Sequence, residues 1–171
     1  MGYCELMNVS ALEEYGLRCA VSLASLQPDQ TLSAPEIAEK EGLSVEYVSK
    51  FMLYLKKAGL VTTIRGVNGG FALSKSPREI SLKEVFEAFG GKSRVSDEEF
   101  CNSFAGKAES CVHQMGCSIR PFWKILSHYI DAFTSEMTLQ DLLGPETEIL
   151  LKTEVIALKN IQALKDQYEH K

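Results

Sequence analysis

The sequence lacks a long apolar run, since no stretch reaches the roughly 20 residues that a membrane-spanning helix requires. Its opening residues, MGYCELMNVS, lack the charged start, the apolar core and the small-residue cleavage site of a secretory signal. We therefore expect a soluble cytoplasmic protein with no membrane association.

Motifs that mark catalytic sites are missing as well. The sequence contains no phosphate-binding loop, no serine elbow and no paired-carboxylate motif. Its three histidines, His113, His128 and His170, do not form a nucleophile–base pattern. We therefore expect neither an enzyme nor a protein with a small-molecule substrate.

Acidic side chains are absent between Tyr47 and Arg78, although the whole chain has a formal net charge of -5. That stretch carries six basic residues: Lys50, Lys56, Lys57, Arg65, Lys75 and Arg78. A chain with a pI near 5.3 does not coat nucleic acid indiscriminately, so any contact with DNA must come from a local positive face. The charge pattern predicts specific, salt-sensitive DNA binding.

The residues before and within this stretch predict two helices joined by a tight turn. Ser33-Ala34-Pro35-Glu36 is typical of a helix start, and Gly42 closes that helix. Ser44 caps the second helix of this pair, which ends at Gly59. The connection between the two helices is as short as that of a helix-turn-helix. The apolar spacing predicts that the buried stripe of the second helix consists of Val45, Val48, Met52 and Leu55.

A β-hairpin is predicted directly after this helix pair. The segments 60–64 and 70–73 are typical of short strands, and Gly66-Val67-Asn68-Gly69 supplies the residues of a tight turn. The fold class is therefore mainly α with a small β-hairpin wing, a winged helix-turn-helix. We expect Ser49 and Lys50 to approach base edges and Arg65 to enter the minor groove, with phosphate contacts from Lys56, Lys57 and Lys75. The competing interpretation is a helix pair that only packs, with a solvated basic face.

Two helices with wide apolar faces follow the winged module. The first covers 118–136, and after a short helix at 138–143 the second covers about 146–168. Such faces favour homodimerisation. We therefore divide the chain into a DNA-binding domain (7–91), a cysteine-bearing loop (92–117) and a dimerisation region with C-terminal helices (118–171).

Five cysteines, an odd number, do not form a disulfide framework. Three of them, Cys101, Cys111 and Cys117, lie in the long loop without periodicity, whereas Cys19 lies on an apolar helix stripe and is expected in the core. Thiolates bind soft metals and iron-sulfur clusters, and a flexible loop lets three of them converge. The alternatives are free or redox-active thiols, or a zinc site that uses His113 or His128.

Several of these segments resemble the family of bacterial winged-helix transcription regulators typified by IscR, NsrR, RsrR and CymR. The resemblance covers about residues 7–143. It rests on the runs Glu14-Tyr15-Gly16-Leu17-Arg18, Ser44-Val45-Glu46-Tyr47-Val48, Leu55-Lys56-Lys57-Ala58-Gly59-Leu60-Val61 and Arg65-Gly66-Val67-Asn68-Gly69-Gly70-Phe71-Ala72-Leu73.

The resemblance implies a homodimeric repressor or activator, here expected to be a repressor, on a partly palindromic double-stranded DNA operator. In this family, recognition-helix positions that match Glu46, Ser49 and Lys50 face bases, and the arginine that matches Arg65 enters the minor groove. Glu46 is implied by the resemblance alone, although a carboxylate can accept a hydrogen bond from cytosine.

The resemblance also implies an iron-sulfur cluster that senses redox state, nitric oxide, oxygen or iron, with 2Fe-2S favoured over 4Fe-4S. The spacing from Cys111 to Cys117 matches the family, while the gap from Cys101 is longer than usual. The fourth ligand that it implies is Glu14 from the partner subunit, because Arg18 replaces a histidine that other members use. A cluster-free thiol switch or partner-dependent regulator of the same fold is the alternative, followed by a cysteine redox enzyme or an interaction module without DNA binding.

Overall fold

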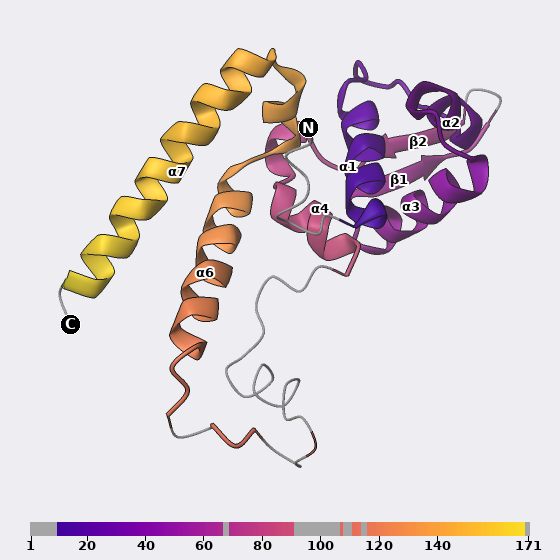
Figure 1. The fold of residues 1–171 in the computed structure, drawn as a ribbon. Helices are drawn as coiled ribbons and strands as arrows, with labels where there is room; N and C mark the ends of the chain where they lie inside the picture. Colours follow the sequence, from indigo (N-terminus) through magenta and orange to yellow (C-terminus); the bar gives the residue numbers. More distant parts are fainter. Residues whose placement is uncertain (1–9, 67–68, 91–106, 108–110, 114–115, 170–171) are drawn as a thin grey trace.

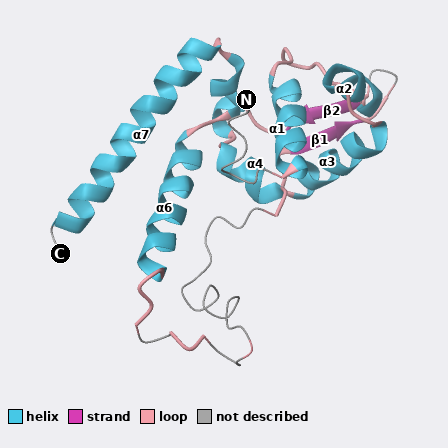
Figure 2. Cartoon of the chain, viewed as in Figure 1, coloured by secondary structure: helices cyan, strands magenta, loops and turns pink. Residues whose placement is uncertain are grey.

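Helices dominate the computed structural model, which describes residues 10–66, 69–90, 107, 111–113 and 116–169 (Figures 1 and 2). In chain order its elements are α1 (Ala11–Ala24), α2 (Ala34–Glu41), α3 (Val45–Lys57), β1 (Val61–Ile64), β2 (Gly70–Leu73), the 3-10 turn η2 (Pro77–Glu79), α4 (Leu82–Ala88), α6 (Arg120–Glu136), the 3-10 turn η3 (Leu139–Leu143) and α7 (Glu146–Glu169). The mainly helical class with one small hairpin is thus confirmed.

Local capping chemistry explains where the helices of the winged module begin and end. Ser10, Ser33 and Ser81 each accept a hydrogen bond from the backbone of a glutamate three residues later, and that glutamate bonds back to the serine N–H. Gly42 follows α2 with a φ of 67°, a left-handed conformation that costs glycine little. The helix start predicted at Ser33 is confirmed, and the starts of α1 and α4 follow the same pattern.

The two strands pair antiparallel, with Val61 opposite Leu73 and Ile64 opposite Gly70. β2 is also bonded on its other side, because Phe71 N–H donates to Leu32 O at 2.8 Å. A Cβ at Gly70 would lie 2.6 Å from that same carbonyl oxygen, so this position requires glycine. Residues 67 and 68 of the predicted turn lie outside the described residues.

The core of the module lies between α1, α3 and α4, where the largest buried side chains include Phe51, Leu55 and Val85. Val48, Met52 and Leu55 are buried as the sequence predicts. Val45 is not, since 40% of it is exposed, and the prediction for this residue was wrong. Val45 is the first residue of α3, and the helical turns that pack on the core begin after it, at Val48. Phe51, which the sequence pattern did not assign to the stripe, fills the central position instead.

Gly16 allows α1 to approach α4 closely. A Cβ at this position would lie 2.3 Å from the ring of Phe89, which is itself buried. That ring makes edge contacts with Phe51 and Tyr54, at centroid distances of 6.3 and 6.1 Å. Because α3 carries both of these partners, Gly16 controls the packing beneath the recognition helix.

Beyond the module, α6 and α7 pack on each other as a helical hairpin (Figure 1). The C-terminal end of α6 is tied to the module by backbone hydrogen bonds, Leu82 N–H to Met137 O and Leu139 N–H to Ile80 O. No described helix is long and apolar enough to cross a membrane.

The Gly16→Ala variant should be destabilised, because the added methyl group collides with a ring that cannot move without disturbing α3. We expect the free energy of unfolding to fall by about 1–3 kcal/mol in urea titrations. Gly116→Ala is the control, since no atom lies within 4 Å of its added Cβ. Gly16→Ala combined with Phe89→Leu should recover part of the loss, and a single variant as stable as the wild type would contradict this account of the packing.

Candidate nucleic-acid interface and cysteine segment

One face of α3 points away from the core and carries the polar residues that are predicted to contact DNA. Its residues recur at helical spacing and are all exposed: Glu46, Ser49, Lys50, Leu53 and Lys57. Val48, Met52 and Leu55 anchor the opposite side. The structure therefore places Glu46, Ser49 and Lys50 together on one accessible surface.

Glu46 stays ionised at neutral pH. Its own backbone N–H and then the Ser44 hydroxyl, both at the N-terminal end of α3, hold the pKa of its carboxyl below the usual value. The carboxylate can therefore only accept hydrogen bonds, and it repels phosphate. On a DNA-facing surface these properties favour contact with a base amino group over contact with the backbone.

The predicted basic residues are not equally available. Lys56 Nζ donates to Thr63 Oγ1 on β1 at 3.0 Å, which orients the lysine between α3 and the wing. Arg65 is exposed directly after β1. Lys75 is paired with Glu84 of α4 at 3.3 Å, which leaves it less free for a phosphate.

Leu53 is a candidate that the sequence interpretation left out. It lies between Ser49 and Lys57 on the outward face, and 51% of it is exposed. An apolar side chain in this position can contact a thymine methyl group. The signal was available in the sequence, because a leucine interrupts an otherwise polar helical face.

Of the cysteines in the long segment, Cys111 and Cys117 are described. Both are free and half-buried, and both precede α6. Cys101 lies outside the described residues, and Glu14 is exposed on the first turns of α1. Within the described ranges of this single chain, no group of three or more His, Cys, Asp or Glu side chains is placed to hold a metal ion.

A family model described as Rrf2, iron-dependent transcriptional regulators, matches residues 9–145, most of the chain. The chain belongs to the Rrf2 family of transcriptional regulators. It is 30% identical over 144 residues to the regulator NsrR of Bacillus licheniformis, a match that covers 84% of this chain and 96% of the relative. It is 27% identical over 137 residues to IscR of Photobacterium profundum, with 80% and 76% covered.

Solved structures of family members share the fold. IscR of T. potens superposes with a TM-score of 0.64 at 26% identity and covers 83% of this chain and 89% of its own. CymR, the global cysteine regulator of B. subtilis, gives a TM-score of 0.59 at 25% identity, with 78% and 94% covered. The helix α7 begins at Glu146, just beyond the residues that the family model matches.

Arg18 has a structural role in this chain. Its guanidinium Nε lies 3.0 Å from Glu41 Oε2, and Nη2 donates to the Glu41 carbonyl at the same distance. The Ser22 hydroxyl also donates to the Glu41 carboxylate. Arg18 therefore joins α1 to the end of α2.

Cys19 is a core residue and a poor nucleophile. Burial and the nearby Glu41 carboxylate raise its pKa to about 12, and Arg18 only partly opposes them. At pH 8 its thiolate fraction is about 1 in 10⁴. This residue can therefore be set apart from the cysteines of the segment before α6.

Thiol labelling should separate these cysteines. In native, chelator-treated protein at pH 8, we expect iodoacetamide to modify Cys111 and Cys117 well before Cys19, as followed by mass spectrometry of peptides. Raising the pH to 9 should leave Cys19 the slowest of the three, because its pKa still lies far above the solution pH. In denaturant all three should react alike, and native labelling of Cys19 as fast as Cys111 would refute its assignment to the core.

Proposed function

We propose that this transcriptional regulator binds a double-stranded DNA operator as a homodimer, with one winged helix per half-site, and that an iron-sulfur cluster controls its affinity. The observation that carries the DNA-binding part is the outward face of α3 together with the exposed Arg65 beside it. The most economical action is repression, because occupation of an operator by a dimer is by itself enough to exclude other proteins.

The exposed groups divide by their chemistry. Ser49, Lys50 and the ionised Glu46 would contact base edges in the major groove, where donors and acceptors differ between base pairs. Arg65 would enter the minor groove, and Lys56, already oriented by Thr63, would hold a phosphate. Because the chain has a net charge of -5, its other surfaces do not add nonspecific affinity for DNA.

The dimer contact that we propose is the third face of α6. One face of this helix meets α4 through Asp131, and another meets α7 through Tyr129 and Ala132. The remaining face carries apolar residues that are 38–59% exposed: Phe122, Trp123, Leu126 and Ile130. An apolar helix face of this size favours burial, and a self-complementary contact of two copies buries it twice.

Alanine substitution of Lys50 or Arg65 should weaken DNA binding by about 1–3 kcal/mol each, because each side chain contacts the duplex directly. The probe is a fluorescent operator that the wild-type protein has selected from a random duplex library, read by anisotropy at several salt concentrations. Arg65→Ala should also reduce the salt slope by about one ion.

Lys165→Ala is the matched control for these variants, since this exposed lysine lies on α7 and outside the proposed interface. An Arg65→Ala protein with unchanged affinity and salt slope would refute the role of the wing. Loss of binding in the control would mean that the effect is one of net charge alone.

For the cluster, the chemistry of the donors fits. Cys111 and Cys117 are unpaired, partly accessible thiols on one segment, and thiolates are the usual ligands of iron-sulfur clusters. Cys101 and the partner's Glu14 complete the proposed set. When bound, a 2Fe-2S cluster supplies a redox-active centre whose charge responds to oxidants. Because Glu14 comes from the other protomer, this ligand set would connect the two chains.

Anaerobically purified protein should contain iron and acid-labile sulfide in equal amounts and absorb visible light. Cys111→Ala or Cys117→Ala should each abolish the absorption, and Glu14→Ala should shift it, because a ligand is lost in every case. Cys19→Ala is the control that keeps the colour, since its buried thiol holds no iron. Colourless protein without iron or sulfide would rule out the cluster.

A second candidate is a thiol switch without metal. It is favoured by the likeness to CymR, the global cysteine regulator of B. subtilis, and by the accessible thiols of Cys111 and Cys117. In that case DNA affinity would survive removal of iron and change on thiol oxidation. The metal analysis and this oxidation assay together separate the two candidates.

A further inference from the structure

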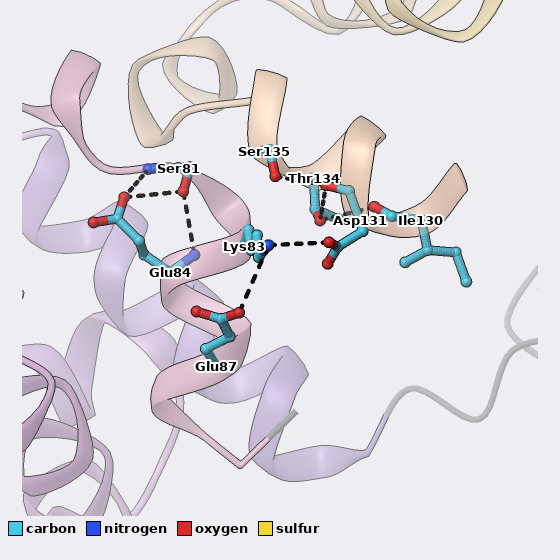
Figure 3. A network of polar contacts seen from close by, with 8 residues as sticks. All are labelled: Ser81, Lys83, Glu84, Glu87, Ile130, Asp131, Thr134 and Ser135. Carbon is cyan, nitrogen blue, oxygen red and sulfur yellow. Dashed lines mark hydrogen bonds and ion pairs between the residues drawn. The ribbon is translucent and has the colours of Figure 1, made fainter. Parts of the chain in front are cut away.

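Asp131 is the one charged residue that is buried among the residues that the structure describes, and neither DNA contact nor metal binding uses it. It lies on α6 with only 5% of its side chain exposed, and its Oδ2 lies 3.0 Å from Lys83 Nζ on α4 (Figure 3). A buried carboxylate is costly unless it is paired and hydrogen-bonded. The contact therefore contributes to holding together two elements that are far apart in sequence.

The location of this pair gives it a mechanical role. Near Met137, at its C-terminal end, α6 is fixed to the winged module by the backbone bonds of Leu82 and Leu139. Asp131 lies six residues earlier, about 9 Å along the helix axis. One attachment alone would act as a pivot, whereas two attachments define a direction. Phe133, between these two sites, also packs on the core of the module, and the ion pair adds a charged contact of defined geometry that favours one direction of α6.

Helix α6 extends well past this second attachment. From Asp131 to Arg120 the helix continues for about 16 Å, towards the segment that carries Cys111 and Cys117. A tilt of about 10° around Met137 would move Arg120 by about 4 Å. Figure 1 shows α6 leaving the module in this way, with α7 beside it.

Lys83 can separate from Asp131 without losing all of its polar contacts. Lys83 has 29% of its side chain exposed and a second carboxylate, Glu87, at 3.9 Å, so its ammonium keeps a partner and solvent if Asp131 withdraws. On α6, the hydroxyls of Thr134 and Ser135 donate to the carbonyls of Ile130 and Asp131 at 2.8 and 2.6 Å (Figure 3). Such bonds weaken a helix locally, and here they lie between the two attachments.

We infer that the Lys83–Asp131 pair is the positioning contact that fixes the angle between the winged module and α6. In a dimer joined through α6, this angle determines the distance between the two recognition helices and therefore the half-site spacing that the protein accepts. The inference rests on the proposed dimeric binding of an operator. It adds that discrimination of spacing resides in this pair, which touches neither DNA nor the cysteines.

The test measures affinity against spacing. The operator selected by the wild-type protein is remade with one or two base pairs added or removed between its half-sites. We expect the wild type to lose about tenfold or more in affinity per changed base pair. The double variant Lys83→Met with Asp131→Leu should discriminate by less than about threefold, because apolar replacement of both partners keeps the fold but removes the directional, charge-assisted hydrogen bond between α4 and α6.

Two matched variants separate positioning from general damage. Lys83→Arg retains the pair and should keep the wild-type discrimination. Glu87→Gln removes only the outer carboxylate and should do the same. Binding to a single half-site should be equal for all variants, since the winged module is unaltered.

Each outcome is decisive. Full discrimination by the double variant, with wild-type binding intact, overturns the inference alone. A wild-type protein that binds no duplex, or binds all spacings equally, overturns the proposed dimeric operator binding and with it the inference. Reduced discrimination in the double variant, together with intact discrimination in Lys83→Arg and Glu87→Gln, supports it.

Discussion

Burial of the inner face of α3 is the constraint on which the rest of this structure depends. Phe51 and Leu55 are almost completely excluded from solvent, and Phe89 of α4 packs edge-on against Phe51. Close packing of this kind leaves a helix little freedom to rotate. With one face fixed, the residues on the other face can present a constant pattern to a duplex. The base-contacting role proposed for α3 is therefore a consequence of its core.

The same reasoning extends to the second half of the chain. α6 has three distinct surroundings: the charged contact with α4, the packing against α7, and an exposed apolar face. The roles proposed for these surroundings are, in turn, to fix the direction of the helix, to stiffen it and to join two copies. A helix with three such faces can connect the cysteine segment at one end with the winged module at the other. It is therefore one route by which the cysteines could influence DNA binding, beside the proposed ligand Glu14 on α1.

Local signals made much of the fold predictable. The capping serines Ser10, Ser33 and Ser81 and the closing Gly42 act on neighbouring backbone, so their effect can be recognised in the sequence. The prediction failed at Val45 and Phe51, because which apolar residue enters the core depends on where the neighbouring helices lie. The 3-10 turn at Pro77–Glu79 was also missed, since short turns carry little periodic signal. Of the candidate site, the exposed face of α3 was predicted apart from Leu53. The DNA contacts of its residues and all four proposed cluster ligands, Cys101, Cys111, Cys117 and Glu14, stay predictions.

The sequence by itself determined the helix starts, the hairpin and the one-signed charge, because capping, strand propensity and net charge are properties of neighbouring residues. It also identified the family, because the motifs of α1, α3 and the wing are contiguous. Only the tertiary structure decided that Gly16 makes room for Phe89 and that Lys83 neutralises Asp131 across α4 and α6. Lys83 and Asp131 are separated by 48 positions in the chain, so no local pattern relates them. Their meeting depends on the packing of the whole module, as does the angle at which α6 leaves it.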